Sequence, residues 1–227
     1  MATTSFSLER ALDGLEQDGF VDLKDESIGE HVLQMEQRRF PFSSKYGLDF
    51  CDSYVLQDKR IRSIIESVFP RCILAHWLRY EAYPGHIVSF MQGGQKAGRC
   101  AVMVHLLSKG SRVNYFLGSH LLELPATKGR RLLWETALSA LTDAGHVASE
   151  KTFEQGGMVI IDARTRYEIK EGYAIKFEFV TEDLVTTKWP KMMLPSMDSL
   201  RRKVDEMQSA KIALNFAFYD HLVAEPK

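Results

Sequence analysis

Two stretches decide the fold that this sequence predicts: AVMVHLLSKGSRVNYFLGSH (residues 101–120) and GGMVIIDARTRYEIKEGYAIKFEFV (residues 156–180). In the first, apolar residues fill the alternating positions of 101–107, and a Ser-Lys-Gly-Ser turn leads to a second run, which predicts a β-hairpin. In the second, three short apolar runs are separated by an Asp-Ala corner and by Lys-Glu-Gly. Short strands with regular turns are typical of a sandwich or barrel, and these two stretches are expected to supply its paired central strands.

The remainder of the chain predicts helices and further strands around this centre. Ser7 opens a capping-box-like helix start, the helical spacing ends at Gly19, and a strand follows at 20–23. The pattern also predicts helices over 26–40, 58–69, 130–144 and 196–224, strands over 72–82 and 86–91, and an irregular aromatic loop over 42–56.

We therefore expect one α+β domain, mainly β with flanking helices. Its parts are an N-terminal helical and loop support (1–70), a β core (71–190) and a C-terminal helix (191–227). A chain of 227 residues is long enough to bury a substantial core without disulfides or a structural metal.

Composition bounds the class of protein. The chain is 45% hydrophobic and 26% charged, with a formal net charge of -1, so it has no broad basic surface for nucleic acid. No window approaches 18 uninterrupted apolar residues, which excludes a membrane-spanning helix. Three scattered cysteines and an N-terminus without a signal-peptide pattern lead us to expect a cytoplasmic protein.

Three segments resemble phytanoyl-CoA-dioxygenase-like members of the iron and 2-oxoglutarate-dependent oxygenases. They are RVNYFLGSH (112–120), GGMVIIDARTRY (156–167) and the early helix followed by Asp-Gly-Phe-Val (18–21). The resemblance spans residues 8–180 and implies a double-stranded β-helix, or jelly roll. The same order of Gly-Ser-His and Gly-Gly-x-Val-Ile also resembles a group of fungal proteins.

The resemblance also implies a catalytic centre that this chain does not reproduce. The family holds iron with a His-x-Asp or His-x-Glu pair and a second, later His, which leaves positions for 2-oxoglutarate and oxygen. None of the seven histidines here has an acid two positions later. The residues at those positions are all apolar: Leu33, Leu78, Val88, Leu107, Leu122, Ala148 and Val223.

Two further family positions carry different side chains. Tyr167 stands where the distal His belongs, and the late strand 173–180 offers Lys176 in place of the Arg that binds the 2-oxoglutarate carboxylate. Lys is a point charge without the planar fork of Arg. Matched to the family, the sequence therefore predicts a barrel that has kept its frame and lost its iron, with no cofactor of its own.

Some side chains are candidates for a remaining pocket. Asp162, Arg164, Tyr167 and Lys176 are expected either to line it, as in a metal-free isomerase or cyclase, or to fill the former site as a buried ion pair. Alternation places Arg164 and Arg166 on the face opposite Tyr167. An atypical oxygenase would need another metal set, for which His86 and His105 on neighbouring strands, with Glu81 or Asp162, are the candidates.

A non-catalytic oxygenase fold suggests a partner. We expect a heterodimer with a catalytic iron and 2-oxoglutarate oxygenase, in fungal terpenoid or meroterpenoid biosynthesis as the resemblance implies, or a homodimer that binds a small molecule. Aromatic residues in the predicted loop and C-terminal helix are the interface candidates: Phe50, Tyr54, Phe216 and Phe218.

Overall fold

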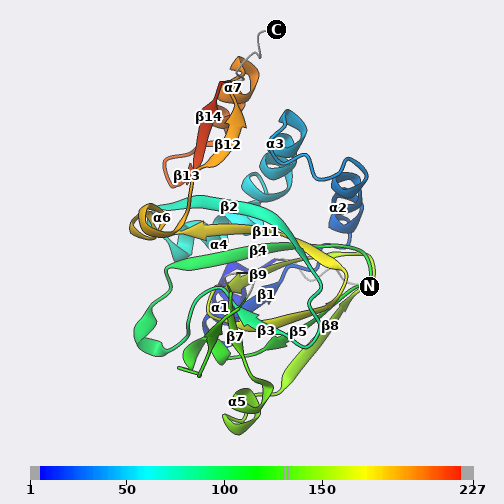
Figure 1. Ribbon diagram of the computed structural model, residues 1–227, viewed down its shortest axis with the longest axis vertical. Coiled ribbons are helices and arrows are strands. Elements are labelled where there is room, and N and C mark those ends of the chain that lie inside the picture. Colours follow the sequence, from blue (N-terminus) through cyan, green and yellow to red (C-terminus); the bar gives the residue numbers. More distant parts are fainter. Residues whose placement is uncertain (1–5, 130, 132, 221–227) are drawn as a thin grey trace, which may run out of the picture.

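Two six-stranded β-sheets face each other and form a jelly roll, with helices packed on the outer side of one sheet (Figure 1). The structure is a computed structural model and describes residues 6–129, 131 and 133–220. A third element, a small two-stranded ribbon with a helix, projects from the barrel near the C-terminus. The predicted α+β jelly roll is confirmed.

Sheet A contains the longest strands and is bounded at both edges by strands from the ends of the chain. All of its neighbours are antiparallel except β13, which pairs with β2 in parallel. In spatial order the strands are β1 (Phe20–Asp22), β9 (Gly157–Asp162), β4 (Ala101–Leu107), β11 (Tyr173–Val180), β2 (Cys72–Glu81) and β13 (Ile212–Leu214).

Sheet B is antiparallel throughout and closes the other side of the barrel. A register shift interrupts the pairing of β10 with β5 near Ile169. In spatial order the strands are β6 (Thr127–Lys128), β7 (Trp134–Thr136), β3 (Ile87–Ser89), β10 (Arg166–Glu171), β5 (Ser111–Phe116) and β8 (Ala148–Phe153).

The two stretches that decided the fold do pair with each other, but the hairpin prediction was wrong. β4 pairs with β9 and β11 in sheet A, whereas β5 pairs with β10 and β8 in sheet B. The Ser-Lys-Gly-Ser turn therefore carries the chain from one sheet to the other. Gly110 at this turn has a φ of 72°, a backbone conformation that favours glycine.

Sheet A is buried on both faces, which explains why β4 is apolar at every position but one. Val102, Val104 and Leu106 pack against the helices, while Met103 and Leu107 face sheet B. His105 lies between the last two on the same face and is fully buried. The face between the sheets is therefore where buried polar residues need an explanation.

The helices are stabilised by the caps that the sequence predicts. Ser7 and Asp58 accept hydrogen bonds from backbone N–H groups in the first turns of α1 and α4. Helix α5 lies at the opposite end from the C-terminal projection (Figure 1). The helices are α1 (Leu8–Gln17), α2 (Ile28–Gln37), α3 (Lys45–Cys51), the π-helix η1 (Asp52–Leu56), α4 (Lys59–Val68), α5 (Leu138–Asp143), α6 (Glu182–Lys188) and α7 (Asp198–Met207), with short 3₁₀ turns η2 (Gln95–Ala97) and η3 (Ser119–Leu121).

Three predicted elements were wrong. The loop over 42–56 is helical, as α3 and η1. The helix over 130–144 is replaced by strand β7 and the short α5, with residues 130 and 132 outside the described residues. The C-terminal helix ends at Met207 and is followed by two strands, and residues 221–224 of that prediction lie outside the described residues.

The C-terminal arm, defined as β12 (Met192–Pro195), α7 and β14 (Phe216–Tyr219), stands apart from the barrel sheets (Figure 1). β12 and β14 pair in parallel with each other and with no other strand that the structure describes. Both strands therefore keep an unpaired edge. No described helix combines the length and apolarity needed to cross a membrane.

Candidate functional site

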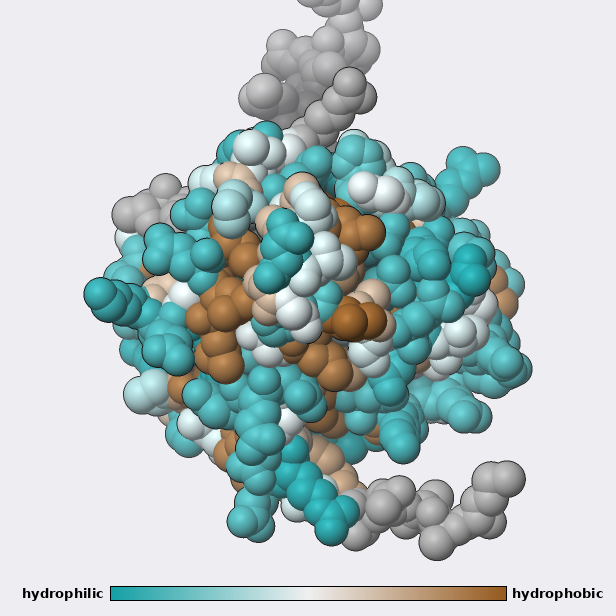
Figure 2. Space-filling model, turned by 90° about the horizontal axis from the view of Figure 1, so that it is seen from below, coloured by the Kyte–Doolittle hydropathy of each residue, from teal (hydrophilic) through white to brown (hydrophobic). Residues whose placement is uncertain are grey.

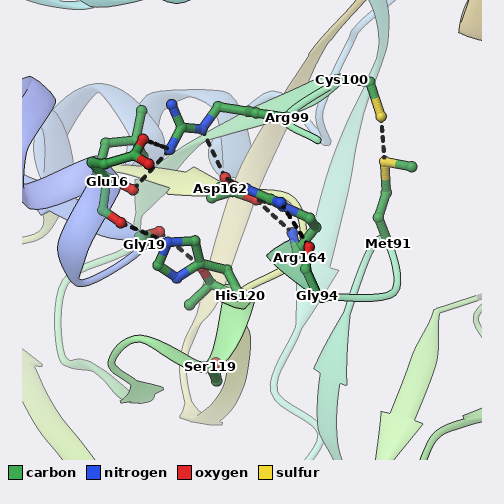
Figure 3. A network of polar contacts seen from close by, with 12 residues as sticks. Glu16, Gly19, Met91, Gly94, Arg99, Cys100, Ser119, His120, Asp162 and Arg164 are labelled. Carbon is green, nitrogen blue, oxygen red and sulfur yellow. Dashed lines mark hydrogen bonds and ion pairs between the residues drawn. The ribbon is translucent and has the colours of Figure 1, made fainter. Parts of the chain in front are cut away.

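The four predicted pocket residues fall into two separate groups. Tyr167 and Lys176 point into the barrel between the sheets. Asp162 is the last residue of β9 and Arg164 follows the strand, and the two pair with each other on the side of α1 (Figure 3). The sequence grouped all four in one cavity, and the structure does not bring them together.

Both carboxylate oxygens of Asp162 accept hydrogen bonds from side chains or backbone of the same chain (Figure 3). The Arg164 guanidinium donates two hydrogen bonds to the Asp162 carboxylate, from Nε to Oδ1 at 2.9 Å and from Nη2 to Oδ2 at 2.8 Å. The backbone N–H of Arg164 adds a third, at 3.0 Å. Arg99 Nε donates to Oδ2 at 2.8 Å, and its Nη2 reaches Glu16 of α1. We call these four residues the Asp162 network.

Electrostatics agree with a structural role for this network. Burial alone would raise the pKa of Asp162, but the hydrogen bonds and charge of Arg164, together with Arg99, lower it. The carboxylate is therefore ionised at neutral pH, and its lone pairs are already taken by donors of the same chain. The Asp162 network ties α1 to the end of β9 and leaves no free acid for chemistry.

Inside the barrel lies a second polar group, centred on an ion pair. Lys176 Nζ lies 2.7 Å from Glu178 Oε1, and both side chains are almost fully buried. The ammonium also lies 3.9 Å from the centroid of the Tyr80 ring and 4.7 Å from that of Phe90, which are cation–π distances. Glu178 Oε2 accepts a 2.8 Å hydrogen bond from Trp189 Nε1.

His105 and Tyr167 complete this group, which we call the interior cluster together with Tyr80, Lys176 and Glu178. The His105 and Tyr167 rings meet edge to face at 5.1 Å. Within the described residues, neither ring nitrogen of His105 nor the Tyr167 hydroxyl has a hydrogen-bond partner, although all three atoms are buried. Burial, reinforced by Lys176, lowers the pKa of His105 to about 3, and burial raises the pKa of Tyr167 to about 12. Both side chains are therefore neutral at neutral pH.

The sequence predictions missed Glu178, whose carboxylate balances the charge of Lys176 in the interior cluster. Its signal was present, because it stands two residues after Lys176 and so shares the same face of a strand. Trp189 follows helix α6 and Phe90 follows strand β3. No local sequence pattern indicates that these two side chains contact the Lys176–Glu178 ion pair. The structure contains two buried ion pairs, Asp162 with Arg164 near α1 and Lys176 with Glu178 between the sheets, so the acid that pairs with Lys176 is Glu178 and not Asp162.

The alternative metal set is not assembled. His86 precedes β3 in sheet B and lies 3.0 Å from Glu135, whereas His105 belongs to β4 in sheet A, so the two are not on neighbouring strands. Among the described residues, no three His, Cys, Asp or Glu side chains are arranged to hold a metal ion. The donor set that the described part of the chain offers therefore does not fit the iron that the resemblance implies.

The second question is whether Lys176 is free to bind a 2-oxoglutarate carboxylate. The charge of Lys176 is already balanced by Glu178 within the chain. Leaving Glu178 buried without this counter-charge would cost several kcal/mol, about 3–5. Lys176 is therefore already engaged in an ion pair inside the barrel.

A cleft of about 710 Å³ opens beside the interior cluster. Tyr80 and Glu178 of the interior cluster reach its wall, together with Trp134 and Trp189. Its volume is in the range of small-molecule sites. A separate cavity of about 10 Å³, enough for about one water, adjoins Tyr167.

The interface candidates are mostly covered by their own chain. Phe50 is 4% exposed and belongs to the core between the helices and sheet A, so it is not available to a partner. Tyr54, Phe216 and Phe218 are half-buried against the same core.

Comparison with solved structures establishes the class of fold. The epimerase SnoN, solved with Fe3+, alpha ketoglutarate and nogalamycin RO, has a TM-score of 0.54 and 16% sequence identity over 77% of this chain and 83% of its own. EctD from S. alaskensis, solved with 2-oxoglutarate and 5-hydroxyectoine, gives 0.52 and 9% over 81% and 79%. HygX from Streptomyces hygroscopicus, with iron bound, gives 0.52 and 13% over 84% and 91%.

The chain therefore has the double-stranded β-helix fold of the iron and 2-oxoglutarate-dependent oxygenases. At such low identity the likeness establishes the fold and leaves the activity open. No family model and no curated protein matches the sequence.

Proposed function

We propose that this protein does not carry out iron and 2-oxoglutarate chemistry itself and acts as a non-catalytic partner subunit of a catalytically complete oxygenase of the same fold. The observation that carries the proposal is the buried Lys176–Glu178 pair, which stands where the resemblance places the cosubstrate contact. Beside it, Tyr167 replaces the expected distal His. Iron and 2-oxoglutarate would belong to the partner.

The C-terminal arm is the surface that we propose for this partner. Three large apolar side chains are exposed here, namely Met193 (49%) and Tyr219 (40%) within the arm and Met197 (53%) between β12 and α7. Met193 and Tyr219 belong to β12 and β14, which pair with each other and with no other strand in the described part of the chain. Unpaired edges and Met or aromatic anchors are features of strand-mediated interfaces. A homodimer through the same arm is the competing assembly.

Elsewhere, exposed hydrophobic residues are more dispersed. Figure 2 shows the end of the molecule where α5 lies, with separate hydrophobic groups surrounded by hydrophilic ones. Leu138 at the start of α5 and Val147 shortly after it are among the exposed residues, at 55% and 81%. Scattered exposed apolar residues are normal on soluble proteins, so these positions serve as controls.

The proposed setting in fungal terpenoid or meroterpenoid biosynthesis rests on the resemblance of residues 112–120 and 156–167 alone. The proposed cytoplasmic location rests on the three scattered cysteines.

Tagged wild-type protein and the double variant Met193→Asp/Met197→Asp should be purified from the source cells, and bound proteins identified by mass spectrometry. We expect an oxygenase with an intact His-x-Asp and distal His set to bind the wild type and to be lost from the double variant. Val147→Asp, a matched change at an exposed apolar site, should retain it. Absence of such an oxygenase, or equal binding to all three proteins, would contradict the partner role.

Metal content tests the other half of the proposal. Protein incubated without oxygen with Fe(II) and 2-oxoglutarate and then desalted is expected to hold far less than stoichiometric iron and to consume no 2-oxoglutarate. Stoichiometric iron that disappears in His86→Ala or His105→Ala, together with 2-oxoglutarate turnover, would establish an atypical oxygenase instead.

A metal-free isomerase or cyclase is the second candidate function, and the cleft of about 710 Å³ beside the interior cluster is the observation that favours it. Such an enzyme would work without a partner. Conversion of a substrate by the isolated chain, unaffected by Met193→Asp/Met197→Asp, would support this candidate over the partner role.

A further inference from the structure

We propose that the cleft beside the interior cluster binds a flat, largely apolar small molecule that carries an anionic group, of the class of aromatic carboxylates. This inference goes beyond the partner role, because it assigns a ligand site to this chain itself. It stands on the shape, wall and charge of the cleft and holds whether or not a second subunit is bound.

The walls of the cleft are suited to flat rings. Four aromatic side chains line it from four separate parts of the chain: Tyr80 of β2, Phe90 after β3, Trp134 of β7 and Trp189 after α6. Phe90 and Trp189 lie with ring centroids 5.4 Å apart and their planes inclined by 30°. Aromatic walls of this kind bury flat apolar ligands and stack on them.

The part of the cleft wall formed by Trp189 and Glu178 is held in place without a ligand. Trp189 Nε1 donates to Glu178 Oε2 at 2.8 Å, and Glu178 is itself fixed by Lys176. The indole orientation is therefore set by a buried ion pair, and the wall has little rotamer freedom to lose on binding. Such preorganisation strengthens binding, because fewer groups must be ordered.

The charged residues that line the cleft favour an anionic ligand. Of the described residues that line the cleft, Glu178 is the one acid, and its charge is balanced by Lys176. Lys128 and Arg131 also line it and add two positive charges on the side of β6 and β7. An anionic group is attracted to such a site more strongly than it would be in open water, because the apolar walls lower the local dielectric.

Aromatic rings hold these two cations in position. Lys128 Nζ lies 4.6 Å from the centroid of Trp134, and the Arg131 guanidinium lies 4.6 Å from the centroid of Tyr83. Arg131 Nη1 also donates to the carbonyl oxygen of Glu81 at 2.8 Å. The anion contact that we propose therefore differs from the cosubstrate contact of the oxygenases, since it uses Lys128 and Arg131 and leaves Lys176 with Glu178.

The test uses 2-naphthoate as the probe, 2-naphthalenemethanol as its neutral analogue, and quenching of the fluorescence of Trp134 and Trp189 as the signal. We expect saturable quenching by naphthoate, with about tenfold weaker binding of the alcohol, since a hydrogen bond to a charged group contributes about 1.5–3 kcal/mol. Lys128→Gln should weaken naphthoate binding by about tenfold and leave the alcohol unchanged.

Two variants locate the site. Ala97 lines the cleft and is exposed, so Ala97→Phe should block both probes without disturbing the core and without adding a fluorophore that responds to the probe. Lys96 is not among the residues that line the cleft, so Lys96→Gln is the control for Lys128→Gln and should bind naphthoate as the wild type does. Equal affinity for acid and alcohol, absence of saturable quenching, or full binding by Ala97→Phe would each overturn the proposal.

Discussion

The Asp162 network and the interior cluster are both built around a buried carboxylate, yet they differ in how completely that carboxylate and its neighbours are bonded. Asp162 accepts from Arg164, from Arg99 and from a backbone N–H, and both oxygens are engaged. In the interior cluster the Glu178 carboxylate is likewise engaged, but within the described residues His105 and Tyr167 have buried polar atoms without hydrogen-bond partners, and the Lys176 ammonium, although ion-paired, also lacks a hydrogen bond of regular geometry.

The difference separates a group that is explained by its structural role from one that still needs an explanation. Buried polar atoms in folded proteins are nearly always hydrogen-bonded, so unpartnered ones mark places shaped by something other than stability. The Asp162 network joins α1 to the barrel and is explained by that alone. The interior cluster lies between the two sheets, and its incomplete bonding is what the non-catalytic role that we propose would lead us to expect.

The largest effect should come from breaking the Asp162 network. Asp162→Asn keeps the size of the side chain but leaves two guanidinium groups facing an amide, and we expect a loss of about 5 kcal/mol of unfolding free energy in urea titrations. Glu16→Gln, at the exposed end of the same network, should cost less than about 1 kcal/mol. Equal costs for the two variants would show that Asp162 is not the centre of the network.

The ion pair of the interior cluster should behave differently when both members are replaced. Lys176→Met alone leaves Glu178 buried without its counter-charge and should cost about 3 kcal/mol. In the double variant Lys176→Met/Glu178→Gln, the amide oxygen still accepts from Trp189 and no charge is buried, so most of that loss should be recovered. A double variant as unstable as Lys176→Met would mean that the pair stabilises the fold on its own account.

Acid should weaken the interior cluster through His105. Its folded-state pKa of about 3 lies below the ordinary value of 6.5, so only the unfolded chain takes up the proton as the pH falls through that interval. Stability is therefore fully present above pH 6.5 and is lost below it, by about 1.4 kcal/mol per pH unit from this residue.

His105→Leu should remove that part of the slope, as measured by urea unfolding between pH 6 and pH 4.5, with pH 8 as the reference. Some slope should remain, because burial also lowers the pKa of His76 and of His120. Identical slopes for the wild type and the variant would contradict a neutral, buried His105.

The smallest effect should come from the Tyr167 hydroxyl, because it makes no hydrogen bond. Tyr167→Phe is expected to change the unfolding free energy by less than about 0.5 kcal/mol. Tyr173→Phe, which removes the hydroxyl bonded to Glu36 at 3.1 Å, should cost about 1 kcal/mol despite its greater exposure. A larger loss at Tyr167 would reveal a partner such as an internal water.

Much of the fold was predictable because its signals are local. Ser7 and Asp58 cap the helices that follow them, and strands β2, β4, β9 and β11 of sheet A lie where alternating or continuous apolar runs predict them. Local signals were also missed. Ser44 accepts a hydrogen bond from the Gly47 N–H and caps α3, and the apolar residues Ile212, Leu214 and Phe216 recur every second position, which is the period of a strand.

The rest depends on pairing between distant segments, which no short pattern encodes. A Ser-Lys-Gly-Ser turn after an apolar run suits a hairpin and a crossing between sheets equally well, and only the partners β9 and β10 decide between them. The same holds for the candidate site. Alternation places Arg164 and Arg166 opposite Tyr167, but only the folded chain shows that Asp162 faces α1 while Lys176 faces Glu178.

Both edges of sheet A are closed by strands from near the ends of the chain, β1 against β9 and β13 against β2. During synthesis, β2 is made about 140 residues before its edge partner β13 leaves the ribosome, so its edge stays open for much of translation, at the usual rate of about 5–20 residues per second. A chain shortened before Ile212 would keep that edge uncovered permanently. Such a truncation should aggregate as it emerges, whereas the full-length chain escapes once its last strand has docked.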